Sequence, residues 1–231
     1  MPKAIKKRIA KKISGELEVK DKLASWKDTI KERKKTALRY GAIILIAIIA
    51  ISGFLFYNYT SKKKARMLEY EAYKIYQNIY QTQPINRDER YKKALDMFKK
   101  SYDTRKSPSA LLYIAGCYYE LGRYDESMET LKDFTQRYSN EERFIPLAYE
   151  KLAMIYVKKS DTKEAMKALE ALYNLKGDIY KDVALIEYAR LLEKEGKTEE
   201  AKKKYKELSE RFPNSPFSDE AKAKLTEKKE G

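Results

Sequence analysis

One pattern of apolar and small residues occurs three times in this chain and limits its fold more than any other feature. The first copy begins at Leu111, the second follows 38 residues later at Tyr149, and the third begins 36 residues further on at Leu185. The nine positions that match in type are, in the first copy, Leu111, Ile114, Ala115, Tyr118, Gly122, Tyr124, Ser127, Leu131 and Phe134. A repeat of this length indicates stacked helical units that share one continuous core.

Each copy predicts two antiparallel helices joined by a short turn. Bulky residues at spacings of three and seven, with a small residue between them, favour a first helix that a neighbour can approach closely. Gly122 and Gly196 permit a turn with positive φ, while Ser160 stands in that place in the second copy. The small residues that let the second helix pack on the first are Ser127, Ala165 and Ala201.

The starts of the repeats are also marked in the sequence. Pro108, Pro146 and Pro216 fall at the first repeat position, and Asp182 completes the series. Serine precedes Pro108 and Pro216, which predicts an N-cap followed by a proline in the first helical turn. Three repeats therefore fill residues 107–213.

The quoted residues resemble the tetratricopeptide repeat. Tyr118, Gly122 and Tyr124 match its pattern in the first copy, and Ala201, Tyr205 and Pro213 match it in the third. Ser160 departs from the pattern, as do Phe134, Leu172 and Leu208, which replace a small alanine. The resemblance spans about residues 67–228 and implies an all-α fold, an α-solenoid of helix pairs. A polar capping helix from Phe217 to Lys228 is expected to close it.

Before the repeats stands a stretch of 22 uncharged residues, Tyr40–Ser61. As a helix it would be about 30 Å long, the thickness of a bilayer's hydrocarbon core. We expect one transmembrane helix rather than a buried helix of a soluble core. Ala50-Ile51-Ser52 loosely resembles a signal-peptidase site, but the 39-residue leader and the apolar residues beyond that site favour an uncleaved anchor.

The chain thus divides into five parts by sequence. The predicted parts are a basic arm (1–39), the transmembrane helix (40–61), a juxtamembrane helix with an atypical first repeat (62–106), three repeats (107–213), and the capping helix and tail (214–231). Within the atypical repeat, the first helix is expected at Ala65–Gln81 and an insertion at Thr82–Glu89.

The arm holds 14 Lys and Arg against 5 Asp and Glu, the densest part of a net charge of +15. The positive-inside rule places this arm in the cytoplasm and the repeats outside, although Lys62, Lys63 and Lys64 put basic charge at the other end too. We expect Ser14-Gly15 to break the arm's helix. Three readings of the arm stay open: a disordered topology-setting tail, a segment on anionic lipid, or an RNA contact.

Nothing in the sequence predicts catalysis or a cofactor. Histidine is absent, which excludes the usual Ser/His and Cys/His nucleophile pairs. Cys117 is the only cysteine, so it can form neither an internal disulfide nor a zinc site by itself, and we expect it to be buried and inert. No glycine-rich phosphate loop occurs. We therefore expect a non-enzymatic protein with no metal and no cofactor.

The tetratricopeptide resemblance implies a concave wall formed by the first helix of each repeat. Carried over by register, the candidate protein-binding residues are Leu112, Tyr119, Leu147, Met154, Val157, Ile186 and Arg190. Tyr119 can stack and donate, Met154 is adaptable, and Arg190 can meet a carboxylate. The alternative is that these positions pack against each other or against the first helix, Ala65–Gln81.

The whole layout resembles a bacterial inner-membrane family that includes the ancillary, chaperone-linked subunit of the Sec translocon. That resemblance implies a single-pass inner-membrane adaptor with extracytoplasmic repeats. Its partner would be the Sec translocon, a secretory chain or a periplasmic chaperone, and no nucleic acid is expected. The segment Arg211–Ala221 also resembles repeats in the outer-membrane assembly lipoprotein and the cell-division coordinator. The alternative function is therefore a scaffold of a cell-division or envelope-assembly complex.

Overall fold

The computed structural model describes residues 3–79 and 86–227, without the side chains of residues 3–19. The described residues form nine helices and no strands, so the predicted all-helical class is confirmed. The chain divides into two units, Met1–Thr60 and Ser61–Gly231, and the first helix, α1 (Lys3–Tyr76), contributes residues to both.

The first unit consists of the N-terminal part of α1. Among the described helices, α1 alone holds a stretch long and apolar enough to cross a membrane, and that stretch is not buried. Its large apolar side chains from Tyr40 to Tyr59 are all more than half exposed. By length and composition such a helix can serve as a membrane anchor or as a signal. The predicted break at Ser14-Gly15 is wrong, because one Ser and one Gly cost about 1 kcal/mol or less each among good helix formers.

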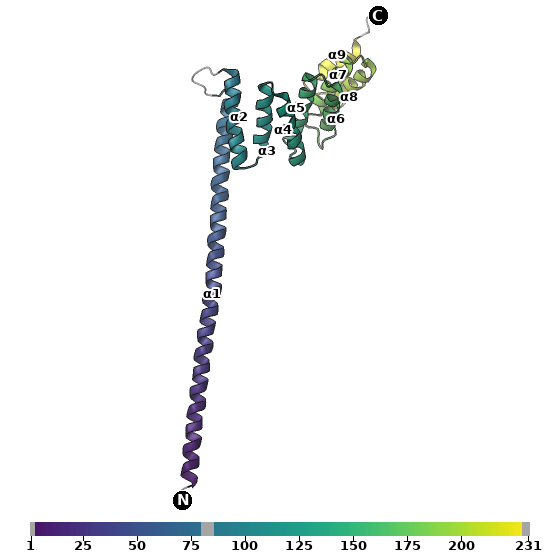
Figure 1. Cartoon of the computed structure of the whole chain (residues 1–231). Coiled ribbons are helices and arrows are strands. Elements are labelled where there is room, and N and C mark those ends of the chain that lie inside the picture. The colour runs from purple at the N-terminus through teal and green to yellow at the C-terminus, as the bar shows by residue number, and fades with distance from the viewer. Residues whose placement is uncertain (1–2, 80–85, 228–231) are drawn as a thin grey trace. The chain divides into compact units, whose positions relative to one another are not determined.

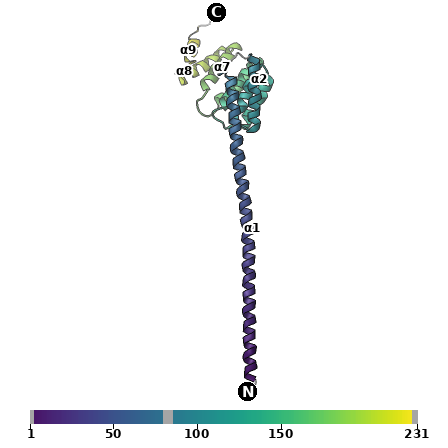
Figure 2. The same ribbon diagram turned by 90° about the vertical axis from the view of Figure 1, so that its left-hand side faces the viewer.

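The second unit is a series of helices, each packed on its neighbours in the chain (Figures 1 and 2). After the end of α1 the helices are α2 (Arg87–Thr104), α3 (Pro108–Glu120), α4 (Tyr124–Arg137), α5 (Ile145–Lys158), α6 (Thr162–Tyr173), α7 (Lys181–Lys194), α8 (Thr198–Arg211) and α9 (Ser218–Thr226). The helix expected at Ala65–Gln81 ends at Tyr76. Residues 82–85 of the expected insertion lie outside the described residues, and the expectation is wrong for Arg87–Glu89, which form the first turn of α2.

The turn after the first helix of each repeat has the same backbone. Gly122 has φ of 72° and Gly196 of 74°, as the sequence predicts, and Ser160 adopts the same conformation with φ of 59°. In the first turn, the N–H of Gly122 donates to the carbonyl of Tyr119, and the N–H of Arg123 donates to the carbonyl of Tyr118. This pair of bonds is the Schellman motif, in which the turn residue is left-handed.

One of the two predicted serine caps is present. Ser107 caps α3, where its Oγ accepts a hydrogen bond from the N–H of Ala110 at 3.1 Å, and Pro108 is the first helical residue. At the second site, Ser215-Pro216, the helix was expected to start at Pro216, which is two residues too early. Ser215 Oγ accepts from the N–H of Phe217 at 3.2 Å inside a turn, and α9 begins only at Ser218. The Ser215 hydroxyl also donates to Asp182 Oδ2 at 2.7 Å, which links this turn to the start of α7.

The core runs through the second unit as three adjoining clusters of buried side chains. Tyr102, Met166 and Tyr188 each pack against two of these clusters and join them. The small residues of each pair are buried as predicted, and Ser127 Oγ donates to the carbonyl of Ala115 at 2.7 Å. A core of this kind depends on contacts between neighbouring repeats, as in other solenoids.

The last helix, α9, closes the final cluster. Ala221 is fully buried there, and Phe217 and Leu225 pack against it. Its outward side is charged, with Asp219 and Lys222 exposed. The helix therefore caps the core as expected, but it contributes apolar contacts as well as a polar surface.

Candidate protein-binding groove

A cavity of about 330 Å³ opens between α3, α5 and α7 and the start of α9. Its lining comes mainly from the first helices of three successive repeats, the face that the repeat register predicts. The lining residues are Tyr119, Glu150, Ala153, Met154, Val157, Lys158, Leu169, Val183, Glu187, Leu191 and Phe217. We call this cavity the groove.

The floor of the groove is apolar. Met154 and Val157, three residues apart on α5, leave 40% and 38% of their surfaces exposed, whereas Leu152 and Ile155 on the same helix are buried. Fully burying such a side chain contributes roughly 1.5–3 kcal/mol, and part of that gain is still available to a ligand. Methionine also adapts its shape to different partners.

Glu150 gives the groove an unusual charge. This side chain is half-buried one turn before Met154, and within the described part of the chain it has no hydrogen-bond or ion-pair partner. Burial raises the pKa of its carboxyl, Lys151 opposes that rise, and Glu187 adds to it. A buried carboxylate without a partner is costly, so a ligand cation that reached Glu150 would be favoured.

Arg190 and Phe217 fix the C-terminal end of the groove. The guanidinium of Arg190 makes a bidentate pair with Glu220 of α9, at 3.0 and 2.6 Å, and a third bond of 2.6 Å to Glu187 Oε1. Its centre lies 5.9 Å from the centroid of the Phe217 ring. The carboxylates that Arg190 was expected to meet are thus the chain's own.

Tyr119 stands at the opposite end of the groove. Its ring packs edge-on against Tyr124, with centroids 5.4 Å apart, and Lys151 Nζ lies 4.6 Å from its centroid. Burial raises the pKa of the Tyr119 hydroxyl. These contacts hold the ring in place at the edge of the groove.

The structure brings together three of the seven predicted binding residues. Tyr119, Met154 and Val157 line the groove. Leu112 and Leu147 are half-buried outside it. Ile186 is fully buried in the last core cluster, which also contains Leu208 of α8 and Ala221 of α9, so it offers no surface. Whether these residues bind a partner stays a prediction.

Sequence reasoning missed Phe217, Leu169 and Leu191 as lining residues. Phe217 was assigned to the capping helix, but it is the residue before the first turn of α9 and it lines the groove. Leu169 belongs to a second helix, a class of position that the register rule does not consider.

The alternative of packing against the first helix holds for the first repeat. A Cβ on Gly116, which occupies the same register position as Met154, would lie 3.1 Å from the Tyr76 hydroxyl of α1. The corresponding surface of α3 is therefore covered, and the groove is open over α5.

A solenoid of helix pairs with an open groove on its first helices defines a helical-repeat protein. A family model described as the tetratricopeptide repeat-like domain matches residues 35–227, and the chain belongs to that family. A search of curated proteins found no match.

Solved structures agree with the fold. Repeats of a kinesin light chain from Podosopora anserina are similar with 15% identity and a TM-score of 0.53, covering 71% of this chain and 84% of that one. MamA from Desulfovibrio magneticus RS-1 is similar with 14% identity and a TM-score of 0.51, covering 70% and 87%. Tetratricopeptide-repeat proteins are generally non-enzymatic scaffolds that bind peptides or proteins, and this fold is suited to a protein–protein interaction adaptor.

Proposed function

We propose that this chain is a non-enzymatic, membrane-anchored adaptor that binds extended peptide segments of partner proteins in the groove. The observation that supports this most directly is the exposed Met154 and Val157 beside the unpartnered Glu150. The groove lies on the helix face that repeats of this family use, and three repeats contribute to it.

The preferred ligand follows from the lining of the groove. A segment with an apolar side chain would cover Met154 and Val157, and a Lys or Arg close by would reach Glu150. Such a pairing offsets the free-energy cost of burying the Glu150 carboxylate, and it adds a charge-assisted hydrogen bond. Lys158, at the rim, disfavours a second ligand cation at that end.

The membrane setting rests on residues 40–61 acting as an uncleaved anchor in the bacterial inner membrane. The arm's excess of basic residues supports a cytoplasmic N-terminus and extracytoplasmic repeats. We expect an exported-phosphatase fusion after Gly231 to be active, and an inactive fusion would overturn this orientation. On the extracytoplasmic side of that membrane, the partners would be secretory chains, the Sec translocon or a periplasmic chaperone. The chain would then have an accessory role in protein translocation.

The test is photo-crosslinking in living cells from the groove. A photoreactive residue replaces Met154 or Val157 in the full chain, and the matched control replaces Ile179, which is 61% exposed but lies outside the groove. We expect defined crosslinked partners from the two groove positions alone. Equal products from Ile179 would reject groove binding and favour the scaffold of a division or assembly complex.

A second step identifies the role of Glu150. The crosslinked segment is synthesised as a peptide, and its affinity is measured for the full chain and for Glu150→Gln. The matched control is Glu142→Gln, which removes an exposed carboxylate from the α4–α5 connection. Only Glu150→Gln is expected to weaken the binding of the peptide. The loss should occur only when the peptide keeps its basic residue.

A further inference from the structure

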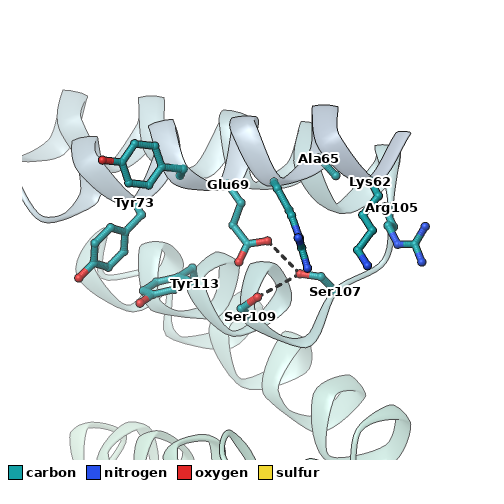
Figure 3. A pocket seen from close by; sticks show the side chains of 10 residues that line it. Lys62, Ala65, Glu69, Tyr73, Arg105, Ser107, Ser109 and Tyr113 are labelled. Atoms are coloured by element: carbon teal, nitrogen blue, oxygen red, sulfur yellow. Dashed lines mark hydrogen bonds between the residues drawn. The ribbon is translucent and has the colours of Figure 1, made fainter. Parts of the chain in front are cut away.

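A second cavity, of about 520 Å³, lies at the other end of the second unit. Its walls come from residues 62–73 of α1, the connection between α2 and α3, and the first turns of α3. Figure 3 shows Lys62 and Arg105 at one end of it and the rings of Tyr73 and Tyr113 at the other, with Glu69 between them. The groove and this cavity share no residue.

Three cations surround this cavity without a partner. Lys62, Arg66 and Arg105 are exposed, and none of their side chains makes an ion pair or hydrogen bond with another described residue. Arginines elsewhere in the unit that do pair with a carboxylate are Arg87, Arg123, Arg137, Arg190 and Arg211. Within the described residues Arg90 and Arg143 also form no ion pair, but Lys62, Arg66 and Arg105 are three unpaired cations that line one cavity.

The polar groups inside the cavity are arranged around the start of α3. Glu69 is the only acid in the lining, and its Oε2 accepts a hydrogen bond from Ser107 Oγ at 3.1 Å. The hydroxyls of Ser107 and Ser109 lie 3.2 Å apart. The N-terminus of α3 adds a partial positive charge at this point. The lining carries three positive charges against one negative charge, which favours an anion with hydroxyl groups.

The position of this cavity in the chain indicates where that anion comes from. Lys62 directly follows the uncharged stretch 40–61, so an anchored chain keeps this end of the cavity at the membrane surface, whatever the angle between the two units. Met67 and Tyr70, on the same segment of α1, leave 60% and 59% of their surfaces exposed. Tyrosine at this level is typical of the lipid headgroup region.

We propose that this cavity binds the headgroup of an anionic phospholipid of the phosphatidylglycerol type. Arg66 and Arg105, with Lys62, bind the phosphate, and Ser109 and Glu69 accept hydrogen bonds from the glycerol hydroxyls. The proposal rests on the anchor of the proposed function but not on the groove. Bound lipid would tie the first repeat to the membrane surface.

The test uses the full chain in nanodiscs of phosphatidylcholine alone, or of phosphatidylcholine in equal parts with phosphatidylglycerol or with phosphatidylethanolamine. Native mass spectrometry counts the lipid molecules that stay bound when the protein is released from the nanodisc. Amide hydrogen exchange is followed across residues 105–113. The pocket variant is Arg66→Gln with Arg105→Gln. The matched control is Lys63→Gln with Lys64→Gln, which removes two adjacent charges that do not line the cavity.

We expect phosphatidylglycerol to be retained and to slow exchange at 105–113 in the unaltered chain and in the control. Each variant loses the general attraction of two basic residues to an anionic surface, about fivefold per residue, and the pocket variant should lose roughly a further 10-fold or more because Arg66 and Arg105 also donate charge-assisted hydrogen bonds to the phosphate. Equal losses in the two variants, equal protection by phosphatidylethanolamine, or equal protection by soluble glycerol 3-phosphate in detergent would each overturn the proposal. A chain that does not enter nanodiscs would reject the anchor and this site together, whereas groove crosslinking tests the adaptor separately.

Discussion

Ser160 offers a test of how the repeat turns are built, because it occupies a position where the other two copies have glycine. Its φ of 59° is left-handed, and the equivalent Gly122 and Gly196 have φ of 72° and 74°. The backbone hydrogen bonds are also equivalent, since the N–H of Ser160 donates to Val157 at 3.0 Å and that of Gly122 to Tyr119 at 3.0 Å. We predict that Ser160→Gly stabilises the protein.

The magnitude follows from two opposing terms. A left-handed φ costs a residue with a Cβ roughly 1–2 kcal/mol, and glycine removes that cost. Glycine also has more conformations in the unfolded chain, which costs about 0.4–1 kcal/mol. Ser160 is exposed and its hydroxyl makes no hydrogen bond with a described residue, so nothing else is lost. The net gain is about 0.5–1 kcal/mol, or roughly 1–4 °C in Tm for a domain of this size.

The measurement is thermal unfolding of the full chain in detergent, followed by near-ultraviolet circular dichroism of its tyrosines. The reverse change, Gly122→Ser, is the matched control, because a Cβ built on Gly122 meets no atom within 4 Å. Its cost should therefore be backbone strain alone, of similar size and opposite sign. A lower Tm for Ser160→Gly, or an unchanged Tm for Gly122→Ser, would refute the reasoning.

Three further predictions address the core, the thiol and the groove. Phe134→Ala should lower the free energy of unfolding by about 3–5 kcal/mol in chemical denaturation, because Phe134 is fully buried between repeats. Burial raises the pKa of Cys117 to about 12, so a maleimide should label it only after unfolding. The pKa of the Glu150 carboxyl is raised, so affinity for a basic peptide should fall as the pH drops through that pKa and the carboxylate is protonated. The Glu150→Gln variant should show no such pH dependence in the same binding titration.

The sequence predicted much of the fold because its repeat positions have one physical role in every copy. A residue such as Ala115 or Ala165 must be small where two helices cross closely, and both are fully buried. Gly122 must permit a left-handed turn, and it does. These roles depend on local geometry and adjacent helices, which are the same in each copy.

The groove was harder to predict because exposure depends on what lies beyond the repeat. Ile186 has the register of a wall residue, yet it is fully buried in a cluster that residues of α8 and α9 complete. Phe217 has no place in the repeat pattern, yet it lines the groove. Neither outcome can be read from a pattern that describes one repeat at a time.

The location of the groove follows from the two ends of the solenoid. Gly116, Met154 and Arg190 occupy one register position in successive repeats. Tyr76 of α1 lies against Gly116, and Glu220 of α9 holds Arg190, so the two end helices occupy this face in the first and third copies. Met154 alone has no such cover and stays 40% exposed. The end helices that complete the core therefore also confine the open apolar surface to the middle repeat, where a single short peptide segment would be enough to cover it.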